Sequence, residues 1–394
     1  MMFLTNLILL TLSLPAVAVG LYLLLLTVLS SKPAPRKPST GQLRFDVIVP
    51  AHDEAAVIES AVASLRGLHW PTDGFRVLVV ADNCTDATAT LARAAGAEVL
   101  ERCDSVRRGK GYALELAFRV SQERGWASAV VVIDADSVVS ANLLEAFAVR
   151  IEDSATAVQA HYQVLNAGAS WRTRLMSIAL ASFHQVRSRA RERLQLSCGL
   201  RGNGWCVTHS LLREVPYQAF SLTEDIEYGI ALGLAGHRVQ YADEAGVAAA
   251  MVSDSRAAGT QRQRWEGGRF RLIRDKTPAL LRAAIGPGGR VCLDLALDLL
   301  VLPLSYVALN VAVLILLAGL ACLRVPAMAP WLWLGVASAS CLALYVLRGW
   351  KLSGVGIRGL LDLARVPHFI VWKVLLMLRA RTSPEWVRTK REQP

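Results

Sequence analysis

The sequence predicts an α/β fold, with a mostly parallel sheet flanked by helices, joined to membrane-spanning helices. Three observations lead to this prediction. Short apolar runs without polar alternation recur between segments of helical spacing, polar clusters follow these runs, and three long stretches contain no charged residue. Apolar runs of this kind are typical of strands buried on both faces, as in a parallel sheet covered by helices.

The charge-free stretches cover residues 1–31, 299–323 and 325–347. Each is long enough to cross a hydrocarbon layer of about 30 Å as a helix. The alternative, helices buried in a large soluble core, is weaker for three such runs near the chain ends. The first run has no basic segment before it, and basic residues follow it, so we expect a retained anchor rather than a cleaved signal peptide.

The flanking charges predict an orientation. Lys32 and Arg36 follow the first span, and Arg348 and Lys351 follow the third, so these ends are expected to be cytoplasmic, with Arg324 in a turn on the far side. This arrangement predicts an integral protein of a bacterial inner membrane with a cytoplasmic catalytic domain. The stretch 359–378 is apolar but interrupted by charges, and we expect an amphipathic helix in the interface, with a fourth span as the alternative.

The net charge of +11 is concentrated in the C-terminal tail. Beside a membrane span, such a tail is expected to bind anionic headgroups of membrane lipids. We expect no nucleic-acid partner, because the chain has no zinc-ligand spacing and no basic patch studded with aromatic residues. Seven cysteines without a CxxC pair indicate free thiols.

Between the first two spans, strands are expected at 45–50, 75–81 and 129–133, and helices at 54–66, 87–95 and 111–124. A longer helix is expected at 171–193. In a parallel sheet, ligands bind beyond the carboxyl ends of the strands. Polar clusters occupy these places, at 51–54, 82–86 and 134–136.

These elements divide the chain into predicted segments. They are an N-terminal transmembrane helix (1–31), a basic Pro-rich linker (32–44), a cytoplasmic catalytic domain (45–260), a segment with interfacial helices (261–290), two further transmembrane helices (291–323 and 325–347), and an interfacial helix with a basic tail (348–394).

The residues at the strand ends suit the transfer of a sugar from a nucleoside diphosphate. Asp82 can accept a hydrogen bond from a pyrimidine imide, although a turn or cap role is the alternative. Asp136 can ligate Mg²⁺ or Mn²⁺ together with phosphate oxygens, and Asp134 can meet the ribose or the metal. Lys110, in a Gly-containing loop before a helix, suits a phosphate, with a solvated basic turn as the alternative.

Two motifs further along complete this set. Thr223-Glu224-Asp225 has the pattern of an ordinary helix start, but Asp225 is also placed to act as a general base. In Gln261-Arg262-Gln263-Arg264-Trp265, Arg264 offers a planar fork for the diphosphate, and Trp265 an aromatic face for a sugar, with interfacial anchoring as its alternative.

Together the motifs resemble those of the membrane-embedded inverting glycosyltransferases of family 2, which include cellulose, chitin and hyaluronan synthases and ceramide glucosyltransferase. The matching strings are Val47–Glu54, Ala81–Asp86, Gly109–Gly111, Asp134–Asp136, Thr223–Asp225 and Gln261–Trp265. The resemblance implies a Rossmann-like GT-A fold, a UDP-sugar donor and Mg²⁺ or Mn²⁺.

By the same resemblance, Asp82 contacts uracil, Asp136 binds the metal and Asp225 is the base. Pro50 and Glu54 belong to the donor-binding strings, and Gln261, Arg264 and Trp265 line the diphosphate and acceptor sites. The chain departs from the pattern at Asn83, where many members carry a second aspartate, and at Asp53, which replaces a common asparagine.

Three spans favour a lipid-linked or short saccharide acceptor over an exported polymer. A processive polysaccharide synthase stays an alternative, and so does a homo-oligomer. Two more distant alternatives are a sugar-nucleotide-forming nucleotidyltransferase and a non-enzymatic transport or sensor protein. The first would need a Gly-rich phosphate loop where Ala51–Glu54 stand, and the second would favour charged residues inside the spans.

Overall fold

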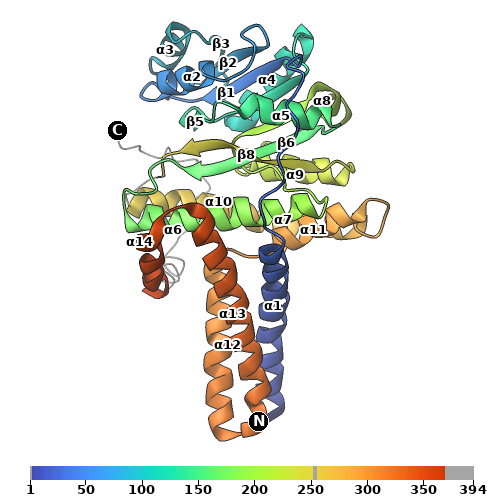
Figure 1. Cartoon of the computed structure of the whole chain (residues 1–394), viewed down its shortest axis with the longest axis vertical. Helices are drawn as coiled ribbons and strands as arrows, with labels where there is room; N and C mark the ends of the chain where they lie inside the picture. The colour runs from blue at the N-terminus through green and yellow to red at the C-terminus, as the bar shows by residue number, and fades with distance from the viewer. Residues whose placement is uncertain (1, 252–254, 369–394) are drawn as a thin grey trace. The chain divides into compact units, whose positions relative to one another are not determined.

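The computed structural model describes residues 2–251 and 255–368, with the backbone alone for 255–266. The chain forms two compact units. Among the described residues, the sheet unit comprises those within 32–166 and 191–298, and the helical unit comprises 2–31, 167–190 and 299–368. Figure 1 shows the elements of both units in chain order.

The sheet unit is built on one eight-stranded sheet with the order β3-β2-β1-β4-β7-β6-β8-β5. The strands are β1 (Phe45–Ala51), β2 (Phe75–Asp82), β3 (Glu98–Arg102), β4 (Ala129–Val132), β5 (Ser137–Val139), β6 (Ala157–Val164), β7 (Trp205–Thr208) and β8 (Val239–Ala249).

The two halves of the sheet differ in strand direction. In the first half, β1 pairs with β2 and β4, and β2 pairs with β3, all in parallel. In the second half, β7 is antiparallel to both β4 and β6, and β5 is antiparallel to β8, while β6 and β8 are parallel. The expected parallel sheet is therefore confirmed for the first half, and the sheet as a whole is mixed.

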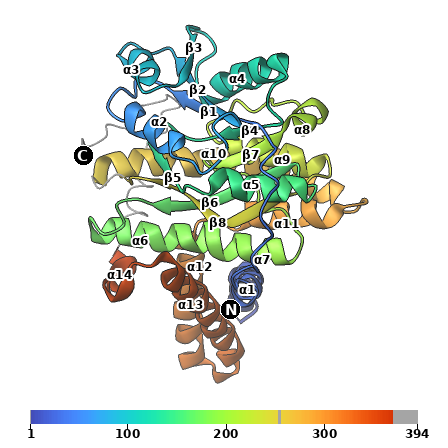
Figure 2. The same ribbon diagram turned by 45° about the horizontal axis from the view of Figure 1, so that its top comes forward.

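Helices cover both faces of the sheet, as Figure 2 shows. The helices of the sheet unit are α2 (Ile58–Arg66), α3 (Thr88–Ala94), α4 (Lys110–Arg124), α5 (Leu143–Glu152), α8 (His209–Glu214), α9 (Glu224–Leu234), α10 (Ser255–Ala283) and most of α11 (Gly289–Leu300). The expected helices near 54–66, 87–95 and 111–124 are α2, α3 and α4, and α2 begins four residues later than expected because a turn precedes it.

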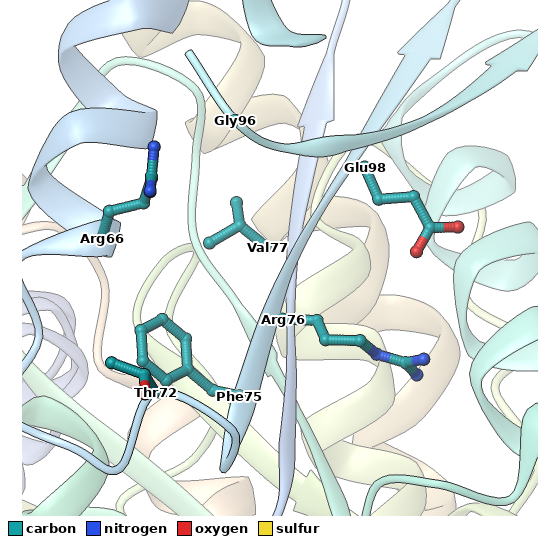
Figure 3. Close-up of a pocket in the computed structure, with 7 residues that line it drawn as sticks. All are labelled: Arg66, Thr72, Phe75, Arg76, Val77, Gly96 and Glu98. Atoms are coloured by element: carbon teal, nitrogen blue, oxygen red, sulfur yellow. The ribbon is translucent and has the colours of Figure 1, made fainter.

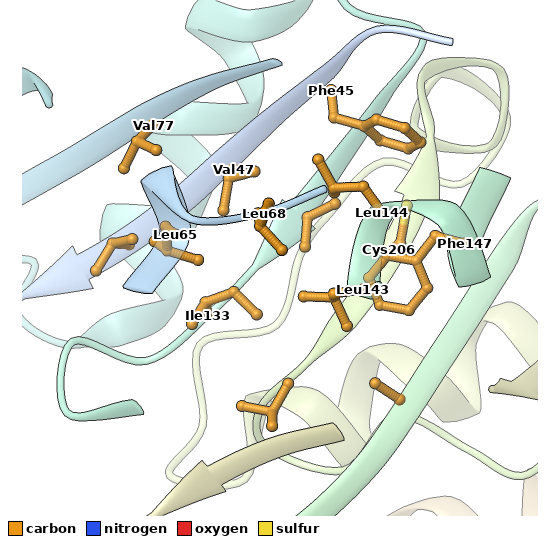
Figure 4. Close-up of a cluster of buried hydrophobic side chains, with 14 of the residues drawn as sticks. Phe45, Val47, Leu65, Leu68, Val77, Ile133, Leu143, Leu144, Phe147 and Cys206 are labelled. Atoms are coloured by element: carbon orange, nitrogen blue, oxygen red, sulfur yellow. The ribbon is translucent and has the colours of Figure 1, made fainter. Parts of the chain in front are cut away.

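Successive side chains of β1 point to opposite faces of the sheet, and this explains why its sequence is apolar at almost every position. Val47 and Val49 of β1 join a core with α2 and α5, to which Leu65 and Phe147 contribute (Figure 4). Ile48, between the two valines, joins a second core on the other face, with side chains of α4, α8 and α9. Because both faces are buried, almost every position of such a strand is apolar, and the buried Asp46 of β1 is paired with Arg76.

The helical unit contains three helices long and apolar enough to cross a membrane: Met2–Val28, Leu304–Arg324 and Pro326–Ser353. They form α1, α12 (Leu304–Arg324) and α13 (Ala329–Ser353), which lie side by side (Figure 1). Polar side chains join them: Trp331 donates to Asn6 Oδ1 at 2.9 Å, and Asn310 donates to the carbonyl of Leu12 at 3.1 Å. Each bond gives a polar side chain on an apolar helix a hydrogen-bond partner on a neighbouring helix.

The second apolar stretch is interrupted. A helix ends at Leu300, α12 begins at Leu304, and Pro303 stands at its N-cap. The expected helix at 171–193 is α6 (Trp171–Leu180), a π-helical turn η1 (Ala181–Val186) and α7 (Arg187–Arg193). Of the stretch 359–378, the structure describes α14 (Gly356–Asp362) and the turn η3 (Leu363–Arg365), and the remainder lies outside the described residues.

Candidate active site

Lys110 lies at the centre of an acidic cluster beyond the carboxyl end of β4. Its Nζ is 2.7 Å from Asp134 Oδ1 and 3.4 Å from Glu224 Oε1, and it donates to the carbonyl of Gly202 at 2.8 Å. Lys110 opens α4, Asp134 follows β4, and Glu224 opens α9. Three segments far apart in sequence therefore converge on one ammonium group.

A glycine makes part of this convergence possible. A Cβ at Gly111 would clash with the carbonyl oxygen of Ala219 and would lie 3.1 Å from the Cα of Phe220. The loop that leads to α9 can thus reach the start of α4 only because residue 111 has no side chain. Tyr112, the next residue, stacks on Phe220 with ring centroids 4.4 Å apart.

Asp225 lies beside Glu224, and its carboxylate accepts the backbone N–H groups of Gly202 and Ile226. Removal from water raises the pKa of Asp225 above its usual range, against the opposing effects of Lys110 and these N–H groups. Burial also raises the pKa of Glu224 to about 7, although Lys110 opposes this and the charge of Asp225 adds to it. For Lys110, burial would lower the pKa, but the attraction of Asp134 and Glu224 outweighs it and raises the pKa well above the usual range.

Asn203, to which sequence reasoning gave no role, holds the turn that carries Asp134 and Asp136. Its Oδ1 accepts the backbone N–H of Asp134 at 2.9 Å, and its Nδ2 donates to Ser137 Oγ at 2.6 Å. The glycines on either side of it have φ angles of +74° and +73°, which explains the Gly-Asn-Gly sequence. Trp205, the residue after this turn, packs in the core against Phe118.

Asp136 is placed to receive a divalent cation. It follows β4 at the same edge as Asp134, is only partly buried, and accepts a 3.3 Å hydrogen bond from Ser137. Mg²⁺ is commonly held by one or two carboxylates and completed by substrate phosphates and water, so this donor set fits such an ion. The Oδ1 of Asp134 is paired with Lys110 at 2.7 Å.

Asp53, Cys84 and Asp86 form a second group of possible metal-ligand atoms. Their carboxylates accept backbone N–H groups of the loops after β1 and β2. Asp53 Oδ1 accepts the N–H of Thr85 at 2.6 Å, and Asp86 Oδ2 accepts that of Ala55 at 3.1 Å. Burial raises the pKa of Cys84, so its thiol stays protonated and is a poor ligand for Mg²⁺ or Mn²⁺. Asp53, where an asparagine was expected, has a φ of +53° and shapes the turn after β1.

Asp82 ends β2 and is paired with Arg102, which ends the neighbouring strand β3. Their side chains are 2.6 Å apart between Oδ1 and NH1, and Asn83 also donates to Oδ1 at 2.9 Å. The guanidinium of Arg102 lies 5.7 Å from the ring centroid of Tyr112. Sequence reasoning missed Arg102 because it assigned no strand to residues 98–102, although Val99 and Leu100 there are apolar between charged neighbours.

Pro50 and Glu54 occupy the end of β1 and the turn after it. Pro50 lies in register with Val80 of β2, and the backbone N–H of Glu54 donates to Thr88 Oγ1 at 2.7 Å. Both therefore lie at the carboxyl edge of the sheet, where β1 runs between β2 and β4.

Gln261, Arg264 and Trp265 lie in α10, but their side chains are outside the described part of the chain. The helix itself reaches the start of α9, where Gly268 meets Thr223. Lys276 on α10 and Glu227 on α9 form a second contact, with 3.7 Å between Nζ and Oε1. The backbone of the motif is thus carried by a helix that contacts the acidic helix α9.

A pocket elsewhere on the sheet unit lies at the amino-terminal ends of β2 and β3. Its lining includes Arg66, Phe75, Arg76 and Glu98 (Figure 3). It is at the opposite ends of the strands from Asp82 and is not part of the candidate site.

The comparisons with known proteins agree with this geometry. Residues 43–268, more than half of the chain, match the model of the family described as glycosyltransferase like family 2. The chain therefore belongs to this family of glycosyltransferases.

Two curated relatives are informative. The chain is 26% identical over 261 residues to a β-monoglucosyldiacylglycerol synthase of Nostoc sp. (strain PCC 7120), covering 64% of this chain and 54% of the relative. It is 23% identical over 211 residues to a probable glycosyltransferase of Bacillus subtilis (strain 168), covering 50% of this chain and 48% of the relative. The chain spans about half the length of these relatives.

Among solved structures, a mannosyltransferase from Pyrobaculum calidifontis in complex with GDP-Man and Mn²⁺ has a TM-score of 0.50 and 18% identity, covering 86% of this chain and 99% of that one. This likeness identifies the fold as the GT-A fold of glycosyltransferases, as the sequence motifs implied.

Proposed function

We propose that the protein is a membrane-bound inverting glycosyltransferase that moves a sugar from a UDP-sugar to a lipid-linked or saccharide acceptor. The observation that carries this proposal is the cluster at the carboxyl edge of the sheet, where Lys110 lies between Asp134 and Glu224, with Asp225 beside them. The cluster combines a cation for phosphate with a carboxylate for proton transfer.

In the proposed reaction, Asp225 is the general base. Its carboxylate takes the proton of an acceptor hydroxyl as the hydroxyl oxygen attacks the anomeric carbon. The bond between that carbon and the diphosphate oxygen breaks, and its electron pair leaves with UDP. A single direct displacement with one base inverts the anomeric carbon, whereas retaining glycosidases use a carboxylate pair and a covalent intermediate.

The donor is held by residues from several strand ends. Asp82 and Arg102 offer an acceptor and a donor side by side, which complements an imide N–H and a neighbouring carbonyl of uracil. Pro50 and Glu54 line the same edge, and Lys110 and Arg264 neutralise the diphosphate. Mg²⁺ or Mn²⁺, held by Asp136 with Asp134 beside it, would neutralise charge on the departing diphosphate as a Lewis acid.

The acceptor is proposed to be a lipid or a short saccharide, contacted by Gln261 and Trp265. A relative named for the synthesis of a glucosyl diacylglycerol supports a lipid acceptor, and so do three helices long and apolar enough to cross a membrane. We place these helices in a bacterial inner membrane with the sheet unit in the cytoplasm, where nucleotide sugars are made.

The experiment uses membranes that contain the protein, with radiolabelled UDP-sugars, GDP-mannose, Mn²⁺ and native lipid extract. We expect label from one UDP-sugar to enter the organic phase in step with UDP release. Label in a large aqueous product would support a processive synthase instead. Incorporation from GDP-mannose alone would overturn the assignment of uracil to Asp82 and Arg102, and no incorporation from any donor would contradict the proposed activity.

A further inference from the structure

Thr223, immediately before α9, does not cap the helix in the ordinary way. A threonine at this position usually accepts a backbone N–H of the first turn through its side-chain oxygen. Here the side chain makes no such bond, and Oγ1, in a residue only 5% exposed, has no hydrogen-bond partner among the described residues. The side chain instead faces Gly268 of α10.

The contact between these two residues leaves no room for another atom. A Cβ built on Gly268 would lie 2.6 Å from Thr223 Cγ2 and 3.1 Å from Thr223 Oγ1. Thr223 is β-branched and buried, so its side chain cannot rotate away at low cost. A side chain at residue 268 would therefore move α10 away from the start of α9.

Both partners are close to the proposed chemistry along the chain. Thr223 is two residues before Asp225, and Gly268 is three residues after Trp265 on the same helix. At a rise of 1.5 Å per residue, the backbone of Arg264 and Trp265 lies within about 6 Å of Gly268 along the helix axis. The contact therefore sets the distance between the helix that carries Gln261–Trp265 and the helix that begins at Glu224.

We propose that Gly268 is a positioning residue, whose missing side chain seats α10 against Thr223 and so fixes the Gln261–Trp265 segment relative to Asp225. This inference rests on the proposed function, in which the two segments act on the same donor and acceptor. Geometry of this kind strongly affects rate, since a misplacement of about 1 Å can cost about a hundredfold.

Gly267 is a matched control on the same helix. A Cβ at Gly267 would meet no described atom within 4 Å, whereas one at Gly268 meets Thr223. Gly267→Ala and Gly268→Ala therefore make the same chemical change one residue apart, and alanine favours the helix at both positions.

The test measures kcat and KM in purified full-length protein for wild type, Gly267→Ala, Gly268→Ala, Thr223→Ser and the double variant Gly268→Ala/Thr223→Ser. We expect Gly268→Ala to lower kcat about tenfold to a hundredfold and Gly267→Ala to keep the wild-type rate. Thr223→Ser removes the Cγ2 that an added Cβ would meet, so the double variant should recover most of the lost rate. A merely structural loss would not be restored in kcat by this second change.

The outcomes separate this inference from the proposed function. Wild-type kcat in Gly268→Ala, or no recovery in a folded double variant, would overturn the positioning role while the activity stands. No turnover in wild type and Gly267→Ala alike would overturn the proposed function and the inference with it. If Gly268→Ala alone fails to fold, kcat of the double variant is compared with kcat of Thr223→Ser. A kcat tenfold lower in the double variant than in Thr223→Ser rejects the inference.

Discussion

At the scale of single residues, the start of α9 places two carboxylates, Glu224 and Asp225, beside one ammonium group. Burying a carboxylate disfavours its charged form, and a second carboxylate nearby adds to this effect. Lys110 opposes both effects on the pKa. Its ammonium group, at the start of α4, is paired with Asp134, which follows β4, and with Glu224. Lys110 therefore counteracts the rise in the pKa of Asp225 that burial causes.

This arrangement predicts a pH dependence. Activity requires the ionised form of Asp225, whose pKa is raised by burial, so kcat/KM should rise with pH through a value above the usual aspartate range. Lys110→Met removes a charge that lowers this pKa, so the rising limb of the pH profile should move to higher pH. Lys110→Arg keeps the charge, and its limb should stay near that of the wild type.

The profiles of the three proteins are measured with saturating metal ion and an identified donor. If the rising limb of the kcat/KM profile of Lys110→Met stays in place or moves to lower pH, the electrostatic role of Lys110 is contradicted. A loss of kcat/KM at all pH values without any movement would show that Lys110 acts on the donor alone.

Sequence reasoning assigned Lys110, Asp134 and Asp225 to one site on separate grounds. Asp134 follows a predicted strand at the edge where ligands bind, Lys110 lies in a Gly-containing loop before a helix, and the role of Asp225 came from the resemblance to family 2 glycosyltransferases. Asn203 and Arg102 were missed for a different reason. Their roles depend on which segments become neighbours in the sheet, and the local sequence around each carries no sign of that pairing.

At the scale of elements, strands with two buried faces were predictable, and the others were not. β1, β2 and β4 are apolar at almost every position, which predicts strands in a parallel sheet. β6 and β8 contain polar and charged residues such as Gln159 and Asp243, and they pair across more than seventy residues of sequence. The mixed half of the sheet could not be derived from local pattern.

Close packing within the helical unit depends on glycine in α13. A Cβ at Gly349 would lie 3.0 Å from Ser182 Cβ and 3.1 Å from the carbonyl oxygen of Ile178. We expect Gly349→Ala to destabilise this unit by about 1–3 kcal/mol, the usual cost of overpacking. Small residues at such contacts are typical of helices that pack within membranes.

The matched control for this change is Gly319 of α12, where an added Cβ would meet no described atom within 4 Å. Gly319→Ala should be neutral or stabilising by up to about 1 kcal/mol, because alanine favours a helix. Thermal unfolding midpoints of the two variants in detergent provide the comparison. Equal midpoints for both would contradict the close packing at Gly349.

At the scale of the whole molecule, the chain joins a GT-A sheet unit to a unit whose α1, α12 and α13 are long and apolar enough to cross a membrane. These three long apolar helices were predictable because a charge-free stretch of this length is typical of a transmembrane helix. The break between Leu300 and Leu304 was not predicted, since an apolar run does not reveal where a proline will end one helix and start another.

The proposed orientation places Leu323 on the outer side and Lys351 in the cytoplasm. Both residues are exposed at the ends of candidate spans, so a cysteine at either position is open to labelling. In a Cys103→Ser/Cys322→Ser background, a membrane-impermeant maleimide added to spheroplasts should label Leu323→Cys and not Lys351→Cys. Labelling of Lys351→Cys alone would reverse the orientation and place the sheet unit outside the cytoplasm.

The central claim is that Asp225 takes the proton of the acceptor in a transfer from a nucleotide sugar. The most direct test compares wild type with Asp225→Asn, measuring both turnover and donor binding in the same preparation. We expect kcat to fall by at least about a hundredfold, the usual contribution of a general base, while donor affinity stays at the wild-type value. An Asp225→Asn variant that still transfers sugar at the wild-type rate would contradict this claim.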